Sequence, residues 1–317
     1  MIMVLAISTI LGCSSTNWLT IWIMLEVNVL AMCSILTSNS KSMKKSETST
    51  FMYYLIQVML SIVIVTWVFY SMKENYATNL VVTMTILSKM GMWPMHGWYM
   101  KLISSLEMKQ MSMMIIMTWQ KILPVVLVTT IQTSQVLQTM VVIMVMGTIL
   151  SSLARLNQKF EMKKIMAISS MNNNSWIVVS SLVSMSCMFS FLSIYSMTLV
   201  LTLSLMEKMS VKSKSLMKNF WLNTIMVANI SGLPPLALFW AKILVIKAMM
   251  KSEMPSEMAL TLMVSACLLM YHYLWMTINE TTSTPEKSQM KTKSMKEKTT
   301  MVMVMSVSAL SASMFMS

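Results

Sequence analysis

Residues 79–100 read NLVVTMTILSKMGMWPMHGWYM, an apolar run that is long enough to cross a bilayer as a helix. It carries a charge, Lys89, and a helix breaker between Gly91 and Pro94 close to its middle. Proline lacks an N–H group and clashes with the preceding helical turn. Carbonyl groups freed at such a break inside a membrane must be satisfied by protein or water. The stretch therefore predicts a broken helix that other helices enclose.

The composition of the whole chain is that of a membrane protein. Of its 317 residues, 56% are hydrophobic and only 11% are charged, and the mean hydropathy is +0.66. The strict alternation typical of barrel strands is absent. We therefore expect an all-α integral membrane protein with about eleven transmembrane helices, near residues 1–16, 17–37, 51–71, 79–100, 111–131, 135–154, 164–183, 185–206, 219–246, 257–278 and 299–316.

The basic residues test this assignment independently. If the amino terminus lies on the side of synthesis, the loops on that side hold 18 of the 24 basic residues, and those on the opposite side hold Lys73, Lys247 and Lys251. This is the asymmetry that the positive-inside rule predicts. The net charge of +13 is then explained by topology and by contact with anionic lipids. A nucleic-acid partner is not expected.

A second breaker, SGLPP at Ser231–Pro235, interrupts the run over residues 219–246. Broken helices in corresponding positions are typical of transporters built from inverted repeats. We expect one transmembrane domain over residues 1–317, with repeat one over 1–131, repeat two over 135–278 and a final helix over 299–316. A kink that serves packing alone is the alternative for each break.

Four ionisable residues stand alone in the apolar runs: Glu26, Lys89, Lys121 and Lys242. A charge at the bilayer centre costs about 2.5–3.5 kcal/mol, so such groups should face the bundle interior. A nearby cation favours the ionised form of a buried carboxylate, and burial favours the neutral form of a lysine. These are properties that proton transfer uses. His96, just after the first break, could extend such a relay.

Other interpretations of these residues stay open. Lys121 and Lys242 could extend to the lipid headgroups, Glu26 could be a protonated group bonded to a neighbouring helix, and His96 could be structural. The run over 164–183 adds side chains that could hold water or join helices, namely Ser169, Ser170, Asn172, Asn173, Asn174 and Ser175.

Methionine and cysteine usage gives two further indications. Methionine supplies 45 residues, which fits a genetic code that reads an additional isoleucine codon as methionine, as in animal mitochondria. No Arg-rich presequence precedes the first run, so we expect synthesis inside the organelle. The cysteines lie in or beside apolar runs without metal-ligand spacing, so we expect small core residues and no metal site.

Five stretches, taken together and in this order, resemble the family of mitochondrial NADH dehydrogenase subunit 2, antiporter-like membrane subunits of respiratory complex I. They are NWLTIWIMLEVNVLAM from Asn17, SKMGMWPMHGW from Ser88, TWQKILP from Thr118, KKIMAISSMNNNSW from Lys163 and ISGLPPLALFWAK from Ile230.

The resemblance implies a proton-translocating membrane-arm subunit of NADH:ubiquinone oxidoreductase, a subunit without redox chemistry of its own. It implies that Glu26 is the glutamate of the family's coupling ion pair and that Lys89 is its partner. Lys121 corresponds to the central relay lysine, and Lys242 to the lysine toward the exit half. His96 matches a family histidine after the broken helix.

The sequence departs from the family at Asn173, where a histidine is usual. An amide cannot carry a proton, so a relay there must run through water or elsewhere. The cofactors of the family's enzyme, namely NADH, FMN, iron–sulfur clusters and ubiquinone, are expected in other subunits, and none in this chain. The sequence contains no Gly-rich nucleotide-binding loop that would contradict this expectation.

The resemblance also implies partners and a location. The partners would be other complex I subunits, especially subunits 4 and 4L, and lipids such as cardiolipin. The location would be the mitochondrial inner membrane, with the amino terminus on the matrix side. Two other functions remain: a free-standing cation/proton antiporter of related fold, and a non-conducting scaffold whose buried charges fix helix packing.

Overall fold

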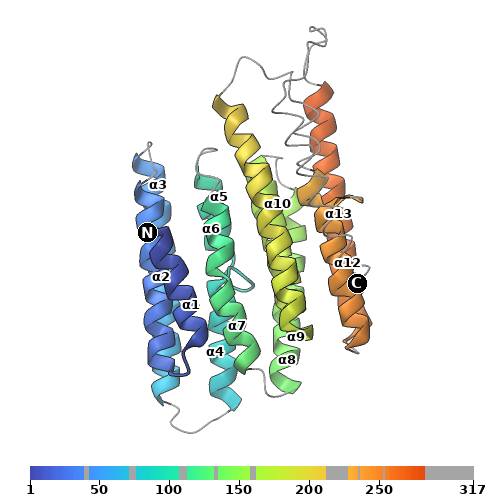
Figure 1. Cartoon of the computed structure of the whole chain (residues 1–317). Helices are drawn as coiled ribbons and strands as arrows, with labels where there is room; N and C mark the ends of the chain where they lie inside the picture. The colour runs from blue at the N-terminus through green and yellow to red at the C-terminus, as the bar shows by residue number, and fades with distance from the viewer. Residues whose placement is uncertain are drawn as a thin grey trace.

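The computed structural model describes residues 1–38, 43–70, 76–106, 113–131, 135–157, 162–211, 228–234, 236–252 and 254–282. These residues form a bundle of helices without a strand (Figure 1). Residues 228–231 are helical and η2 (Arg155–Asn157) is a 3₁₀ turn. The longer helices are α1 (Ile2–Ser14), α2 (Trp18–Ser38), α3 (Met43–Tyr70), α4 (Tyr76–Lys89), α5 (Gly97–Ser105), α6 (Met113–Gln120), α7 (Ile122–Ile131), α8 (Gln135–Ala154), α9 (Met162–Val183), α10 (Met185–Val211), α12 (Ala237–Lys251) and α13 (Ser256–Thr282).

Six helical segments in the described ranges are long and apolar enough to cross a membrane: Trp18–Thr37, Glu47–Phe69, Met114–Ile131, Gln135–Ala154, Met185–Ser204 and Ser256–Trp275. The helix expected over residues 1–16 is present as α1, but its 13 residues rise only about 20 Å. The final helix expected over 299–316 lies outside the described residues.

The outside of the bundle is apolar as well as the inside. Leu30, Phe51 and Leu150 are all more than half exposed, which is what side chains facing lipid require. The expectation that the cysteines are core residues is wrong for two of them, since Cys13 and Cys267 are exposed. In a bilayer, a small apolar side chain is stable on either face of a helix.

The first predicted break is confirmed: α4 ends at Lys89 and α5 begins at Gly97. Gly91 has a φ of 81°, a left-handed conformation that favours glycine. Three successive carbonyls at the break accept hydrogen bonds from side chains of three other helices. Trp98 Nε1 donates to Ser88 O at 3.3 Å, Gln57 Nε2 to Lys89 O at 3.2 Å, and Asn174 Nδ2 to Met90 O at 3.1 Å.

The second predicted break is confirmed between residue 231 and Ala237, where α12 begins. Gly232 has a φ of 82°, as Gly91 has at the first break. Here the freed Ser231 carbonyl accepts a hydrogen bond from Lys242 Nζ at 3.3 Å. A lysine, instead of an amide or indole, thus satisfies this break.

A third interruption was not predicted. The helix expected over residues 111–131 is present as the span Met114–Ile131, but a single turn residue, Lys121, separates α6 from α7. The physical reason is Pro124, which has no N–H group to donate to the carbonyl of Gln120 four residues earlier. The interruption turns Lys121 into the junction of two short helices.

Helix α9 lies at the centre of the described bundle, where it contacts α5, α7, α8, α10, α12 and α13. It is also the helix with the most polar middle, since every residue from Asn172 to Ser175 is at most 2% exposed. Its polar side chains meet other helices: Asn172 accepts a hydrogen bond from Ser265 Oγ at 3.0 Å, and Ser175 bonds Thr148. The bundle therefore has a helix with a polar middle at its centre and apolar side chains on its exterior.

Replacing Gly91 with alanine should destabilise the protein. A Cβ atom there would lie 3.0 Å from the Tyr99 Cβ, and the left-handed φ itself costs about 1–2 kcal/mol for an L residue. Gly97→Ala is the matched control, because nothing lies within 4 Å of its added Cβ. Thermal unfolding of the full chain in detergent micelles measures both, and equal melting temperatures for the two variants would contradict the expectation.

Candidate functional site

Glu26 and Lys89 form an ion pair between α2 and the carboxyl end of α4. The distance from Lys89 Nζ to Glu26 Oε1 is 3.9 Å, and the two side chains are 4% and 21% exposed, respectively. Neither of these two atoms has a hydrogen-bond partner. Lys89 also ends α4, where the helix dipole favours a cation. The pair thus joins a buried lysine to a partly buried glutamate and is loose, without a direct hydrogen bond that would fix its geometry.

Lys121 is held by neutral groups from α5 and α9. Its Nζ donates to Asn174 Oδ1 at 2.7 Å and to the Tyr99 hydroxyl at 3.1 Å. The same Nζ lies 4.7 Å from the centroid of the Tyr99 ring, within the range of a cation–π interaction. The side chain is buried and does not extend to the lipid headgroups.

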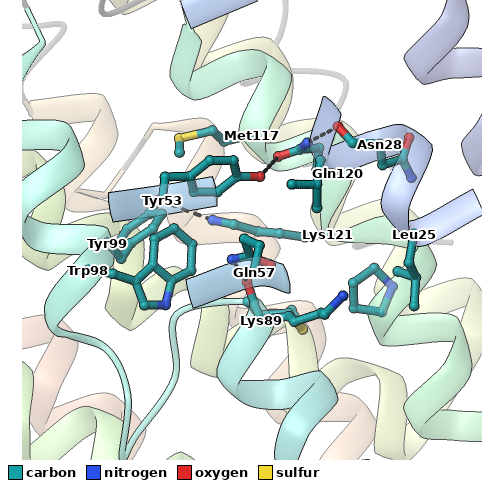
Figure 2. A pocket seen from close by; sticks show the side chains of 13 residues that line it. Leu25, Asn28, Tyr53, Gln57, Lys89, Trp98, Tyr99, Met117, Gln120 and Lys121 are labelled. Atoms are coloured by element: carbon teal, nitrogen blue, oxygen red, sulfur yellow. Dashed lines mark hydrogen bonds between the residues drawn. The ribbon is translucent and has the colours of Figure 1, made fainter. Parts of the chain in front are cut away.

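A cavity of about 40 Å³ lies between these two lysines (Figure 2). A cavity needs roughly 10–15 Å³ of such volume to hold one water molecule, so this one has room for water. In Figure 2, Lys121 extends toward Tyr99, whereas Lys89 extends toward the side of Leu25. Besides the two lysines, the polar side chains that line the cavity are Asn28, Tyr53, Gln57, Tyr99 and Gln120, with Trp98.

The polar lining is a connected network. The Tyr53 hydroxyl donates to Gln120 Oε1 at 3.3 Å, and Gln120 Nε2 donates to the Asn28 carbonyl at 2.9 Å. Ser8 of α1 continues the chain through a hydrogen bond to Asn28 Oδ1. Helices α1, α2, α3 and α6 therefore meet at this cavity through hydrogen bonds.

Lys242 lies on the other side of α9 and does not line the cavity. Its Nζ donates to the Ser231 carbonyl and lies 5.9 Å from the centroid of the Trp176 ring. Trp176 and the Asn174 that holds Lys121 are two residues apart on α9. Helix α9 thus stands between the two lysines and contacts both.

The structure places His96 apart from the lysines. His96 precedes α5, and its Nδ1 lies 3.2 Å from the Pro94 carbonyl. Its Nε2 is buried without a hydrogen-bond partner. The residue does not line the cavity between Lys89 and Lys121. Its role in a relay stays a prediction.

Sequence reasoning missed three contributors to the site: Gln57, Tyr99 and Gln120. Gln57 gave a signal, because it is a lone amide within the apolar run over 51–71. Gln120 gave the same signal, as the one amide in the run over 111–131, whereas Tyr99 gave none, since its role depends on which helices meet. From the sequence, Asn174 was expected only to hold water or to join helices. In the structure it hydrogen-bonds the Met90 carbonyl and also Lys121.

The described residues contain no group of three or more His, Cys, Asp and Glu side chains placed to hold a metal ion. What they contain is a set of enclosed amines with neutral partners, one loose ion pair and a small polar cavity. This arrangement can hold, pass and rearrange protons.

Comparison with known proteins identifies the family. Residues 62–268 match the family described as NADH:quinone oxidoreductase/Mrp antiporter, TM, and the chain belongs to it. The resemblance seen in the sequence motifs is thereby confirmed.

Relatives named NADH-ubiquinone oxidoreductase chain 2 are similar over most of their length. That of Metachirus nudicaudatus is 26% identical over 294 residues, 86% of this chain and 83% of the relative. That of Halichoerus grypus is 29% identical over 84% of this chain and 80% of the relative. That of Locusta migratoria is 27% identical over 85% and 81%, respectively.

The fold resembles that of a chain in the Mrp complex from Dietzia sp. DQ12-45-1b. The TM-score is 0.69 at 11% sequence identity, over 86% of this chain. This chain spans 58% of the length of that one. The fold is thus an Mrp antiporter-like fold.

Replacing Asn174 with leucine should destabilise the protein and loosen the site. It would leave the Met90 carbonyl unpaired and remove one of two hydrogen bonds of Lys121, and each buried group left unpaired costs about 1–3 kcal/mol. Ser193→Leu, at an exposed position of α10, is the control for the change in side chain. Thermal unfolding in detergent measures the loss; a melting temperature unchanged from that of Ser193→Leu would argue against the contacts.

Proposed function

We propose that this chain is a proton-translocating membrane-arm subunit of an NADH:ubiquinone oxidoreductase, and that it contains no redox site of its own. The observation that carries the proposal is the enclosure of Lys89 and Lys121 around one polar cavity, with Lys242 on the far side of α9. The names of the relatives supply the enzyme to which such a subunit belongs.

In the proposed mechanism, the Glu26–Lys89 pair is the switch. The carboxylate stabilises the ammonium of Lys89 across 3.9 Å. A field change from neighbouring subunits that draws Glu26 away removes this stabilisation, and the buried ammonium then releases its proton. Because the pair lacks a hydrogen bond, no such bond has to break when the charges separate.

The released proton would pass through water in the cavity to Lys121. The Tyr53, Gln57 and Gln120 side chains line this path and orient its water. Beyond Lys121, the path would follow the polar middle of α9 toward Lys242. His96 remains a candidate for a branch near the first break.

The partners of the lysines favour a relay over a scaffold. Lys121 and Lys242 are bonded to neutral groups, namely Tyr99, Asn174 and the Ser231 carbonyl. If Lys121 or Lys242 lost its proton, no buried carboxylate would lose its counter-ion. A lysine in a structural ion pair would, on losing its proton, leave a buried carboxylate unpaired. Both protonation states of these two lysines are therefore tolerable.

The wider context follows from the proposal. The chain would have about eleven transmembrane helices in two inverted repeats, each with a broken helix that carries a lysine, within a single domain over residues 1–317. It would lie in the mitochondrial inner membrane with its amino terminus on the matrix side. Its partners would be other subunits of the complex, especially subunits 4 and 4L, with cardiolipin among the lipids. NADH, FMN, iron–sulfur clusters and ubiquinone would bind elsewhere in the complex.

A free-standing cation/proton antiporter is the second candidate, because the fold resembles a chain of the Mrp complex. Sequence identity favours the subunit over the antiporter, because it is 26–29% to chain 2 of the oxidoreductase and 11% to the Mrp chain. Purification under mild detergent separates the two experimentally. Recovery with a large redox assembly supports the subunit, and ion exchange by the chain alone in liposomes supports the antiporter.

Replacing Lys121 with methionine in the assembled complex should remove this subunit's share of the protons moved per NADH oxidised. Methionine fills similar apolar volume but cannot hold a proton. Lys247→Met is the control, since Lys247 is an exposed lysine on α12. Proton uptake and NADH oxidation are measured together in proteoliposomes; wild-type stoichiometry in Lys121→Met would refute the role given to this lysine.

A further inference from the structure

Three tyrosines from three different helices are buried against one side of α9. Tyr99 of α5, Tyr195 of α10 and Tyr273 of α13 are each at most 2% exposed, in a bundle whose exterior has room for such side chains. Tyrosine carries a hydroxyl that usually finds a hydrogen-bond partner when buried. The relay described above uses the first of them only, as a partner of Lys121.

Each of the three tyrosines has a partner at or beside α9. The Tyr99 hydroxyl accepts from Lys121 Nζ at 3.1 Å. Tyr195 interacts electrostatically with both Tyr99 and Tyr273, and its side chain hydrogen-bonds Asn173. The Tyr273 hydroxyl donates to Ser169 Oγ at 2.7 Å.

This row runs along α9 in one direction. From Asn174, which bonds Lys121, to Ser169 is five residues, or about 7.5 Å along the helix axis. The Tyr273 hydroxyl also lies 3.5 Å from the Ile165 carbonyl, one turn nearer the beginning of α9. That end of α9 carries Lys163 and Lys164. The row therefore leads from the middle of the bundle to its basic end.

Unpaired amides accompany the row. Asn172 Nδ2 and Asn173 Nδ2 are buried and have no hydrogen-bond partner. Buried polar groups of this kind are usually satisfied by ordered water, which needs two to four polar partners. The tyrosine hydroxyls beside them supply such partners.

We propose that Tyr99, Tyr195 and Tyr273 form a hydroxyl-lined branch that delivers protons to Lys121 from the basic end of α9. The branch rests on the proposed function and adds its proton-uptake side. In each step, one hydroxyl gives its proton to the next oxygen or to the Lys121 amine while its own oxygen accepts another proton, so each O–H bond that breaks is replaced. Bound water bridges any gap between neighbouring hydroxyls. No tyrosinate accumulates, and the net result is one proton gained by a neutral Lys121.

Asn173 lies beside the middle of the row. The amide cannot carry a proton, but it hydrogen-bonds Tyr195 and so fixes the middle hydroxyl of the row. Packing alone is the competing explanation, and it makes a different prediction, because phenylalanine preserves the ring and removes only the hydroxyl.

The test replaces Tyr195 and Tyr273 singly with phenylalanine in the assembled complex. Protons moved per NADH oxidised are measured in proteoliposomes, together with the solvent deuterium isotope effect on proton uptake. Each variant should lose proton translocation to an extent comparable with Lys121→Met. Tyr271→Phe is the control, because Tyr271 lies on the same helix as Tyr273 but is 60% exposed. Wild-type stoichiometry in both Tyr195→Phe and Tyr273→Phe, or an equal loss in Tyr271→Phe, overturns the branch.

A double variant separates a proton path from packing. Asn173→His in the Tyr195→Phe background restores a titratable group beside the missing hydroxyl and should recover proton translocation. Failure to recover it overturns the assignment of Tyr195 as the middle link. The proposed function is tested separately by Lys121→Met. If that variant pumps normally, the relay as a whole is wrong. If Lys121→Met loses pumping while Tyr195→Phe and Tyr273→Phe keep it, only the branch is wrong.

Discussion

A polar group in the middle of this bundle has to be satisfied within the protein or by enclosed water, because the surrounding hydrocarbon offers no partner. The first break imposes this requirement on the Lys89 and Met90 carbonyls, and the Ser88 carbonyl, which already accepts from Gly91 N at 3.0 Å, takes a further donor. Donors from α5, α3 and α9 meet it. The break thus draws donors from α3, α5 and α9 to one place, and residues of α3 and α5 also line the cavity. Asn174 joins fold and site directly, because its amide nitrogen bonds Met90 and its oxygen bonds Lys121.

The same constraint accounts for the character of the lysines. An ammonium held at the bilayer centre costs about 2.5–3.5 kcal/mol, and hydrogen bonds to neutral partners offset part of this without fixing the charge. Lys121 and Lys242 have partners of this kind. Lys89 has instead a carboxylate at 3.9 Å. Among these three lysines, Lys89 is therefore the one whose described partner carries a charge.

The sequence predicted the features that are local in the chain. Apolar length predicts helices, and Gly91, Pro94 and Gly232 predict breaks, because each depends on a few neighbouring residues. The interruption at Lys121 was equally local, since Pro124 is its cause, and it could have been predicted. The contacts of the site could not. Lys121 and Asn174 are 53 residues apart, and Gln57 and the Lys89 carbonyl are 32 apart, so both contacts exist only once the helices have packed.

Helix α9 is polar at its middle but carries no charged side chain there. A helix with amides and hydroxyls at its middle can donate and accept hydrogen bonds at once, but none of these groups holds a net charge near neutral pH. Charge therefore resides on the lysines at its two sides, one bonded to Asn174 and the other facing Trp176. Burying such a helix is tolerable because it brings no unpaired charge into the centre of the bundle. The same neutral, polar helix also keeps the Lys121 and Lys242 amines from facing each other directly.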